Sequence, residues 1–561
     1  MYRRMDALLH YQKNKRETLA SDLEGSTLGV TGVQNYIPIY KRFFNLDASN
    51  SNALNLNNTL RLQSVGSEKR FRTYECYVED QKGEKAPRTV FFKCSPIIDP
   101  VKYMVGKYKE VESVLDLPTF GGDSCKKSAD VNNSAYVDGF FSFLSSKILH
   151  KHGMHHCIDC YDCFLAKQSD FKQDVIEDLE YLDCSAFFTE NNGKLFQVDE
   201  EEFREFLDYS NGDSRDRRPK LEISGKAIAL DCDAIDDGQF DGIFSAEGAS
   251  QQGETVVEET GHGESDRQDG RSSRSSSCSS RYSYTDSEGS ESDEDSLSDE
   301  DGASTSSGDS DVQVMASIFD FPTELIALEA CDHTLDYLMR TTDIETAQWR
   351  SILMQVIMNL LIFQKAFNLT HNDLHTNNIM YVETQREHLI YKFEGKHYKV
   401  PTFGKLFKII DFGRAIYKYN GNTFCSDSYD ASGDAAAQYN CEPYLNESKP
   451  RLDPHYGFDL CRLGCGLYDD LVPEDQDEAD PLADLITDWC TDDNGKNILY
   501  KKNGEERFQD FKLYIMIARH VHNPTPKAQL EKEFFQMYET PKKKISRKTK
   551  VMDIDELPSY V

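Results

Sequence analysis

The stretch "FNLTHNDLHTNNIMYV", from Phe367 to Val382, crowds His, Asp and Asn between apolar flanks. A core strand at this place would carry Val and Leu instead. Polar side chains in such a setting either form a fully hydrogen-bonded cluster or carry out chemistry. The rest of the sequence decides between these two interpretations.

The overall composition limits the class of protein. The chain has 561 residues, 39% of them apolar, and a net charge of -34. This charge argues against a protein that coats nucleic acid or an anionic membrane, because phosphate would be repelled. No run approaches the roughly 20 apolar residues of a membrane helix, and the charged N-terminus lacks a signal-peptide core. We therefore expect the 15 Cys to be reduced thiols in a cytoplasmic or nuclear protein.

Residues 245–311 differ in composition from the rest of the chain. They contain 18 Asp and Glu against 4 Arg, with almost no Leu, Ile or Phe. Such a segment cannot bury enough apolar surface to offset the entropy of ordering, so we predict a disordered, acidic, Ser-rich insert. Several serines, such as Ser292, precede an acid by three positions, a pattern that acid-directed kinases favour. Phosphorylation of these serines and a plain solvated linker are alternative interpretations.

Strand patterns precede the insert and helical patterns follow it. "FRTYECYVED" and "RTVFFKCSPI" read as strands, and "SAYVDGFFSFLSSKIL" has helical spacing. After the insert, "PTELIALEAC" predicts a buried strand. Residues 343–368 predict a long apolar helix with Asp343 as its N-cap. The order predicts an α+β protein with a small β-rich lobe and a larger helical lobe.

Two motifs follow the long helix and carry the chemistry. The quoted stretch matches H-x-D-x-x-x-x-N through His371, Asp373 and Asn378, and the apolar strand "LFKIIDFG" places Asp411 at its end. Mg²⁺ prefers carboxylate and amide oxygens, and Asp411 and Asn378 can each present one. Asp373 would orient an acceptor hydroxyl and take up its proton. The combination of these motifs predicts phosphoryl transfer from ATP.

The motifs resemble the catalytic and magnesium-binding loops of eukaryotic-type protein kinases, over roughly residues 60–535. "HNDLHTNNIMY" is similar to the corresponding loop in protein kinases of large nucleocytoplasmic DNA viruses, so a viral protein in the host cell or virion is expected. His375, where most kinases carry Lys, and the hairpin-like segment before the D-F-G strand resemble the haspin group. The resemblance implies a bilobal protein-kinase-like fold and a serine/threonine protein kinase that uses ATP and Mg²⁺.

The resemblance also implies a division of the chain. It gives an N-terminal extension (1–59), a β-rich N-lobe with insertions (60–244), the acidic insert (245–311), the last N-lobe strand and hinge (312–331), a helical C-lobe (332–540) and a basic tail (541–561). The tail contains "PKKKISRKTK" and is expected to be a solvated end, with a nuclear signal or nucleic-acid contact as the alternative.

Nucleotide-binding residues follow from the same resemblance. Lys93, in "TVFFKCSP", would hold the α- and β-phosphates. Gly66 is the single glycine of the loop expected to cover the phosphates, where the family usually has three. Backbone groups from Glu329 to Cys331 would bind adenine, with Leu328 lining the pocket behind it.

The acidic partner of Lys93 is left open between Glu112 and Asp138. Glu112 follows Lys93 by 19 residues, a spacing typical of the family. Asp138 lies on an apolar helical pattern, where an acid needs a partner.

Three further positions concern the catalytic loop and the segment after it. Asn372 stands where kinases carry Arg, so no guanidinium is present to bind a phosphorylated activation segment, and activity should not depend on that phosphorylation. The A-P-E motif is missing, and Glu442 is the acid of that region. Asp459 stands where kinases place a helix-borne Asp that supports the catalytic loop.

Other functions fit parts of the sequence. Antibiotic and choline kinases share the H-x-D-L-H-x-x-N pattern, so a small-molecule phosphotransferase is an alternative. A pseudokinase scaffold whose acidic insert recruits basic partners is another, favoured by the glycine-poor loop. The D-F-G motif and the D-x-x-R-L-G motif that begins at Asp459 favour a protein kinase over the small-molecule enzymes. Retention of Lys93, Asp373, Asn378 and Asp411 argues against the pseudokinase, and basic proteins are the partners to expect.

The cluster "HHCIDCYDC" has nearly the spacing of metal ligands. It lacks a second Cys pair at zinc-ribbon distance. We therefore predict buried thiols that pack as small hydrophobic side chains at Cys157, Cys160 and Cys163, with a metal site as the alternative.

Overall fold

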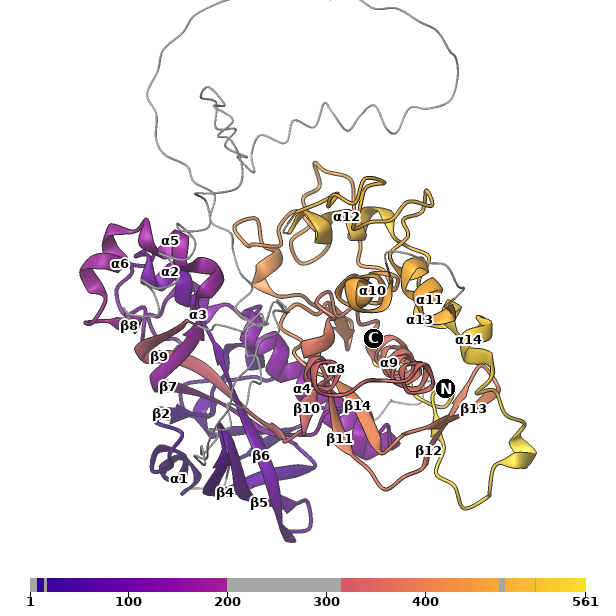
Figure 1. Cartoon of the computed structure of the whole chain (residues 1–561). Coiled ribbons are helices and arrows are strands. Elements are labelled where there is room, and N and C mark those ends of the chain that lie inside the picture. Colours follow the sequence, from indigo (N-terminus) through magenta and orange to yellow (C-terminus); the bar gives the residue numbers. More distant parts are fainter. Residues whose placement is uncertain (1–7, 15–17, 199–313, 474–479, 510) are drawn as a thin grey trace, which may run out of the picture.

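The computed structural model describes residues 8–14, 18–198, 314–473, 480–509 and 511–561. Within these residues the protein is an α+β fold in which a seven-stranded sheet lies beside a helix-rich part (Figure 1). The acidic insert predicted at 245–311 lies outside the described residues. Among the described helices, none combines the length and apolar character needed to cross a bilayer.

The seven-stranded sheet is antiparallel throughout. Its order is β2 (Val30–Gln34), β7 (Cys160–Asp174), β9 (Met315–Glu329), β6 (Lys85–Pro96), β5 (Thr73–Asp80) and β4 (Leu60–Arg70), with β8 (Phe196–Val198) paired to β9. The central strand β9 is buried from Phe321 to Leu328. Ile326 packs towards the helix-rich part, whereas Leu325 packs on the opposite face with Leu23. Both faces are therefore covered, which explains why the end of β9 from Leu325 to Leu328 is apolar at every position.

Helix α4 (Ser134–His152) lies between the sheet and the helix-rich part (Figure 1). Most of its residues are buried because it packs on both neighbours, and this confirms the helix predicted from the sequence. Gly139 allows the helix to approach β9 closely, since a Cβ there would collide with the carboxyl group of Glu324.

The remaining helices are mostly in the second half of the chain. They are α1 (Leu19–Glu24), α2 (Pro100–Met104), α3 (Lys126–Ala129), α5 (Leu179–Asp183), α6 (Ala186–Asn191), α8 (Leu335–Thr341), α9 (Thr346–Phe367), α10 (Phe458–Leu471), α11 (Pro481–Trp489), α12 (Lys512–His520), α13 (Pro526–Gln529) and α14 (Glu533–Gln536). The long apolar helix α9 is confirmed, but the prediction of Asp343 as its N-cap is wrong. Glu345 caps the helix, because Gln348 three residues later completes a reciprocal capping box with it.

Smaller sheets complete the fold. Strands β10 (His333–Thr334), β11 (Ile379–Glu383) and β14 (Lys405–Ile409) form one sheet, and β12 (His388–Phe393), β13 (Lys396–Pro401) and β17 (Met552–Asp553) form another. Two-stranded pairs are formed by β1 (Tyr11–Lys13) with β3 (Leu54–Leu56) and by β15 (Tyr417–Tyr419) with β16 (Asn422–Phe424). The extra hairpin predicted before the D-F-G strand is the antiparallel pair β12–β13.

Two chain ends differ from the division expected from the sequence. Residues before 60 are not a separate extension, because β2 extends the large sheet and Leu23 is fully buried. The tail 541–561 is solvated mainly in its Lys-rich first half, where Lys542–Lys544 are exposed. Its last residues fold back, since Ile554 is fully buried and Tyr560 donates its N–H to the carbonyl of Ala366 at 2.8 Å. Apolar side chains at these positions explain the packing.

Candidate active site

The centre of the candidate site is the side chain of Lys93 on β6. It is buried, and its Nζ lies 2.7 Å from Oδ2 of Asp138 and 3.1 Å from Oδ1 of Asp411. Strand β6, helix α4 and the segment after β14 therefore meet at one cation. The structure thus brings Lys93 and Asp411, which are far apart in the sequence, into direct contact.

Asp138 has a second partner in addition to Lys93. Its Oδ1 accepts a 2.9 Å hydrogen bond from the backbone N–H of Phe412, the residue after Asp411. The same carboxylate therefore fixes both the lysine and the D-F-G segment. Glu112 is exposed and lies outside any helix, so of the two acids left open by the sequence, Asp138 is the one that contacts Lys93.

Burial and the charges of neighbouring groups have opposing effects on the pKa values of this cluster. Burial acts to lower the pKa of Lys93, but the carboxylates of Asp138 and Asp411 outweigh it and raise that pKa. Burial raises the pKa of Asp411 to about 6, opposed by Lys93 and reinforced by the charges of Asp138 and Asp373. The cluster thus holds more negative than positive charge, and an added cation would stabilise it.

The catalytic-loop motif is supported by Asp459 on α10. Its two carboxylate oxygens accept backbone hydrogen bonds of 2.9 Å each from His371 and Asn372. Asn372 has φ 65° and Asp411 has φ 63°, a left-handed backbone that Asn and Asp adopt more readily than other residues except glycine. The buried carboxylate of Asp459 supplies the partners that stabilise this conformation at Asn372.

The pairing of β11 with β14 brings Asn378 and Asp411 near one another. Ile379 of β11 pairs with Ile409 of β14, so Asn378 stands just before one strand and Asp411 just after the other. The amide Nδ2 of Asn378 donates to the carbonyl of Asp373 at 2.9 Å, so its amide oxygen is the atom that could bind a cation. Asp411 and Asn378 are therefore the residues that could hold Mg²⁺.

Asp373 is contacted by a residue that the sequence analysis missed. The hydroxyl of Tyr514, on α12, donates to Oδ1 of Asp373 at 2.9 Å and accepts from Nε of Arg462 at 2.8 Å. Burial would raise the pKa of Asp373, but His375, the guanidinium groups of Arg414 and Arg462 and the Tyr514 hydrogen bond lower it. Arg462 belongs to the D-x-x-R-L-G motif that begins at Asp459, whereas no sequence signal identifies Tyr514.

Two other residues near the cluster are also absent from the sequence-based set. Glu324 is buried on β9, and burial, reinforced by Asp138, raises its pKa well above the usual range. Arg414 follows the D-F-G segment, forms an ion pair with Asp434, and its carbonyl accepts from Nδ2 of Asn372 at 3.1 Å. Neutral hydrogen bonds thus hold the Asn372 side chain in place, and it carries no guanidinium.

The predicted adenine-binding segment lies at the end of β9. Glu329 forms an ion pair with Lys408 of β14 at 2.5 Å and accepts the N–H of Asp159 at 2.9 Å. Cys331 is buried, and its carbonyl accepts from the guanidinium of Arg70 at 2.5 Å. Arg70 ends β4, so it links the β4–β5 hairpin to this segment.

Gly66 lies within β4, on the same hairpin. A Cβ at this position would collide with the carbonyl oxygen of Glu75 on β5. The close approach of the two strands therefore explains the glycine, and its predicted contact with phosphate stays a prediction. Glu442 is exposed and forms a bidentate ion pair with Arg451.

The cysteine cluster is built from thiols that pack in the interior. Cys157 and Cys160 are fully buried, and the sulfurs of Cys160 and Cys163 are 3.9 Å apart. Burial raises the pKa of the Cys157 thiol to about 12. In the described part of the chain, no group of three or more His, Cys, Asp or Glu is arranged to hold a metal ion. The prediction of packed thiols is confirmed for Cys157 and Cys160, and Cys163 is half-buried.

Comparison with known proteins gives one partial similarity. No protein-family model matches the chain. A stretch of 63 residues, 11% of this chain, is 38% identical to a serine/threonine-protein kinase haspin homolog from Arabidopsis thaliana, of which it covers 10%. This short similarity hints at a kinase relationship.

Proposed function

We propose that this chain is an ATP- and Mg²⁺-dependent serine/threonine protein kinase with a two-lobed, kinase-like arrangement. The observation that carries the proposal is the contact of Lys93 with both Asp138 and Asp411, beside the loop that holds Asp373 and Asn378. A phosphate-binding cation, a helix-borne acid, two oxygen donors and a base converge there from separate elements. Phosphoryl transfer requires this set of groups.

The donor set fits Mg²⁺. Asp411 supplies a buried carboxylate whose pKa is raised to about 6, and Asn378 supplies an amide oxygen, both preferred by hard divalent cations. When bound there, Mg²⁺ would neutralise charge on the phosphates of ATP. Lys93 would bind the α- and β-phosphate oxygens, and Asp138 would keep its ammonium oriented.

Asp373 is suited to orient the acceptor hydroxyl. Its lowered pKa keeps it ionised at neutral pH, so it can accept a hydrogen bond from that hydroxyl. As the bond from the acceptor oxygen to the γ-phosphorus forms and the bond to the β,γ-bridging oxygen breaks, Asp373 takes up the hydroxyl proton and ADP leaves. Burial lowers the pKa of neighbouring His375 to about 4, so at neutral pH its ring is uncharged.

Turnover assays test the proposal against its two alternatives. Purified full chain is incubated with labelled ATP and Mg²⁺, with mixed proteins in one arm and mixed amino-alcohol and aminoglycoside metabolites in the other. Label in protein, lost in Asp411→Ala, is the expected result. Label in metabolites alone would indicate a small-molecule phosphotransferase.

Nucleotide binding without turnover would indicate a pseudokinase. Asp373→Asn separates the roles, because it should keep Mg²⁺-dependent nucleotide binding and lose transfer by at least about a hundredfold. An unchanged rate in Asp373→Asn would refute the role assigned to that carboxylate.

A further inference from the structure

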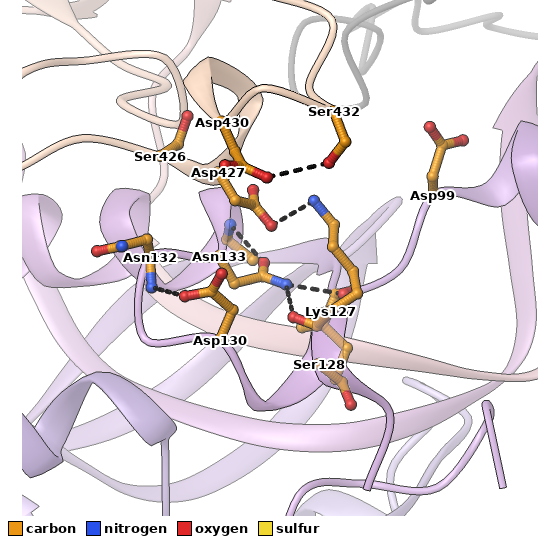
Figure 2. A network of polar contacts seen from close by, with 12 residues as sticks. Asp99, Lys127, Ser128, Asp130, Asn132, Asn133, Ser426, Asp427, Asp430 and Ser432 are labelled. Carbon is orange, nitrogen blue, oxygen red and sulfur yellow. Dashed lines mark hydrogen bonds and ion pairs between the residues drawn. The ribbon is translucent and has the colours of Figure 1, made fainter. Parts of the chain in front are cut away.

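The N-terminus of α4 is held by a segment that follows the D-F-G motif by more than ten residues. This segment begins with the short 3₁₀ turn η7 (Asp427–Tyr429). Figure 2 shows Asp427 pointing towards Lys127 of α3, with Asn132 and Asn133 close by. Residues 300 positions apart in the chain thus meet near the start of the helix that carries Asp138.

Asp427 makes two contacts that tie η7 to this region. Its carboxylate lies 2.5 Å from Nζ of Lys127, and its backbone N–H donates to the carbonyl of Asn132 at 2.8 Å. Only 7% of the Asp427 side chain is exposed, so the carboxylate needs such partners. Burial raises the pKa of Asp427, while Lys127 and the backbone N–H of Ser134, the first residue of α4, act against that rise.

Asn133 links Lys127 to the large sheet. As the N-cap of α4, its side chain accepts the N–H of Ala135 and donates to the carbonyls of Ile97 and Lys127 at 2.8 and 3.0 Å. Ile97 directly follows β6, so the hydrogen bond to its carbonyl connects Asn133 to the strand that carries Lys93. Asp138 follows Ser134 by one helical turn, so the position of this helix end sets the position of the Asp138 carboxylate.

The same turn also contacts the catalytic loop. Tyr429 donates its hydroxyl to the carbonyl of Arg414 at 2.9 Å, and that carbonyl accepts from Asn372 as well. The turn η7 thus connects α4 on one side with the loop that holds Asp373 on the other. The neutral side chain of Asn372 has no charge with which to bind a phosphorylated residue. The negative charge on this segment that contacts a cation is the carboxylate of Asp427, which is present without any modification.

We infer that Asp427 and Lys127 form a built-in ionic clamp that positions α4, and through it Asp138 and Lys93, without phosphorylation of the segment after the D-F-G motif. The inference rests on the proposed kinase function. Asp427 and Lys127 are positioning residues in it, because they act on Lys93 and Asp411 through α4. The negative charge that contacts Lys127 is the carboxylate of Asp427 itself.

The ion pair of Asp427 and Lys127 lies beside a cavity, so variants of either residue should still fold. A cavity of about 410 Å³ opens beside it, lined among others by Asp99, Asp130 and Asp430. Water can therefore reach one side of Lys127, whose side chain is 34% exposed, so loss of its charge should not unfold the chain.

Hydrogen exchange tests the clamp independently of catalysis. In the full chain, Asp427→Asn and Lys127→Gln should speed amide exchange over residues 134–141 by roughly tenfold and leave α9 unchanged. Asp427→Glu and Lys127→Arg should exchange as wild type does. The control Asp116→Asn removes an ion pair with Lys167 that is more exposed, and it should have no effect on α4. Unchanged exchange in both charge-removing variants would overturn the clamp.

Kinetics test whether the clamp positions the site. Asp427→Asn and Lys127→Gln should lower kcat roughly tenfold with little change in the KM of the protein acceptor, and the two conservative variants should restore kcat. Phosphatase treatment of wild type should leave kcat unchanged. Faster exchange in α4 with full kcat would overturn the positioning role. Wild type without any phosphotransfer would overturn the proposed function instead, while the exchange data still decide the clamp.

Discussion

The hydroxyl of Tyr514 donates a 2.9 Å hydrogen bond to the carboxylate of Asp373, and Arg462 in turn donates to that hydroxyl. The chain brings these side chains together from α12, α10 and the loop after α9. The buried carboxylate of Asp373 thus accepts a hydrogen bond from a neutral donor that is itself held in place by a cation.

Tyr514→Phe removes this donor and should raise the pKa of Asp373. The acid limb of the profile of kcat/KM against pH, which reports ionised Asp373, should then move to higher pH, and kcat/KM near neutrality should change much less than kcat/KM on that limb. Tyr500→Phe is the matched control, since Tyr500 donates to the exposed Asp469. An acid limb that stays at the wild-type pH in Tyr514→Phe would contradict this account.

The two candidate acids for Lys93 can be compared directly. Asp138→Asn removes the charge that orients Lys93, so phosphotransfer should fall by about a hundredfold or more. Glu112→Gln changes an exposed residue and should retain nearly all activity. Both rates are measured at saturating MgATP, with melting temperatures to check folding. Equal losses in the two variants would argue against the assignment of Asp138.

The raised pKa of Asp411 predicts that the free energy of unfolding depends on pH. Its folded-state pKa of about 6 lies above the ordinary value of 3.8, so the folded state favours the protonated carboxyl group. The contribution of this group to stability is therefore fully present below about pH 3.8 and is lost as pH rises through 6. Asp411→Asn cannot ionise, so it should be more stable than wild type at pH 8. That advantage should shrink by about 1 kcal/mol between pH 8 and pH 5, as measured by urea unfolding without metal or nucleotide. A difference that is constant over this range would contradict the raised pKa.

The ion pair of Lys408 and Glu329 should contribute to stability through its burial. Lys408 also donates to the carbonyl of Cys157 at 2.8 Å, so Lys408→Met removes a donor from two acceptors and should cost about 3 kcal/mol of unfolding free energy. Adding Glu329→Gln should recover part of the loss. Lys501→Met breaks the exposed pair with Glu505 and should cost less than about 1 kcal/mol. Similar losses for Lys408→Met and Lys501→Met would show that burial is not the cause.

Short-range patterns predict part of the candidate site. Asp373 and Asn378 share one loop, and Asp411 follows an apolar strand, so local spacing is enough to propose them as candidates. The partner of Lys93 could not be chosen from the sequence, because Asp138 meets it only after α4 packs against the sheet. Tyr514 lies 141 residues from Asp373 in a helix of ordinary composition. Contacts of that kind are set by packing and leave no local pattern.

The same limit explains the errors in the fold. Asp is a preferred N-cap residue and Glu is not, so the sequence alone favours Asp343. Gln348 moves the cap to Glu345 through its reciprocal hydrogen bond. The sequence predicts a solvated end of the chain because the Lys-rich part dominates its composition. Met552 and Ile554 nevertheless add a strand beside β12 and a buried contact.

The pairing of β8 with β9 has a consequence for protein engineering. Val198 of β8 lies opposite Ala316 of β9, so the two ends of the long intervening chain are neighbours in the sheet. A connection between neighbouring strands can be very short or very long, since closing a longer loop costs only slowly increasing entropy. Residues 199–313 could therefore be exchanged for a tight turn, or for a reporter domain with adjacent termini, while the hydrogen-bond ladder that supports β6 and Lys93 is kept.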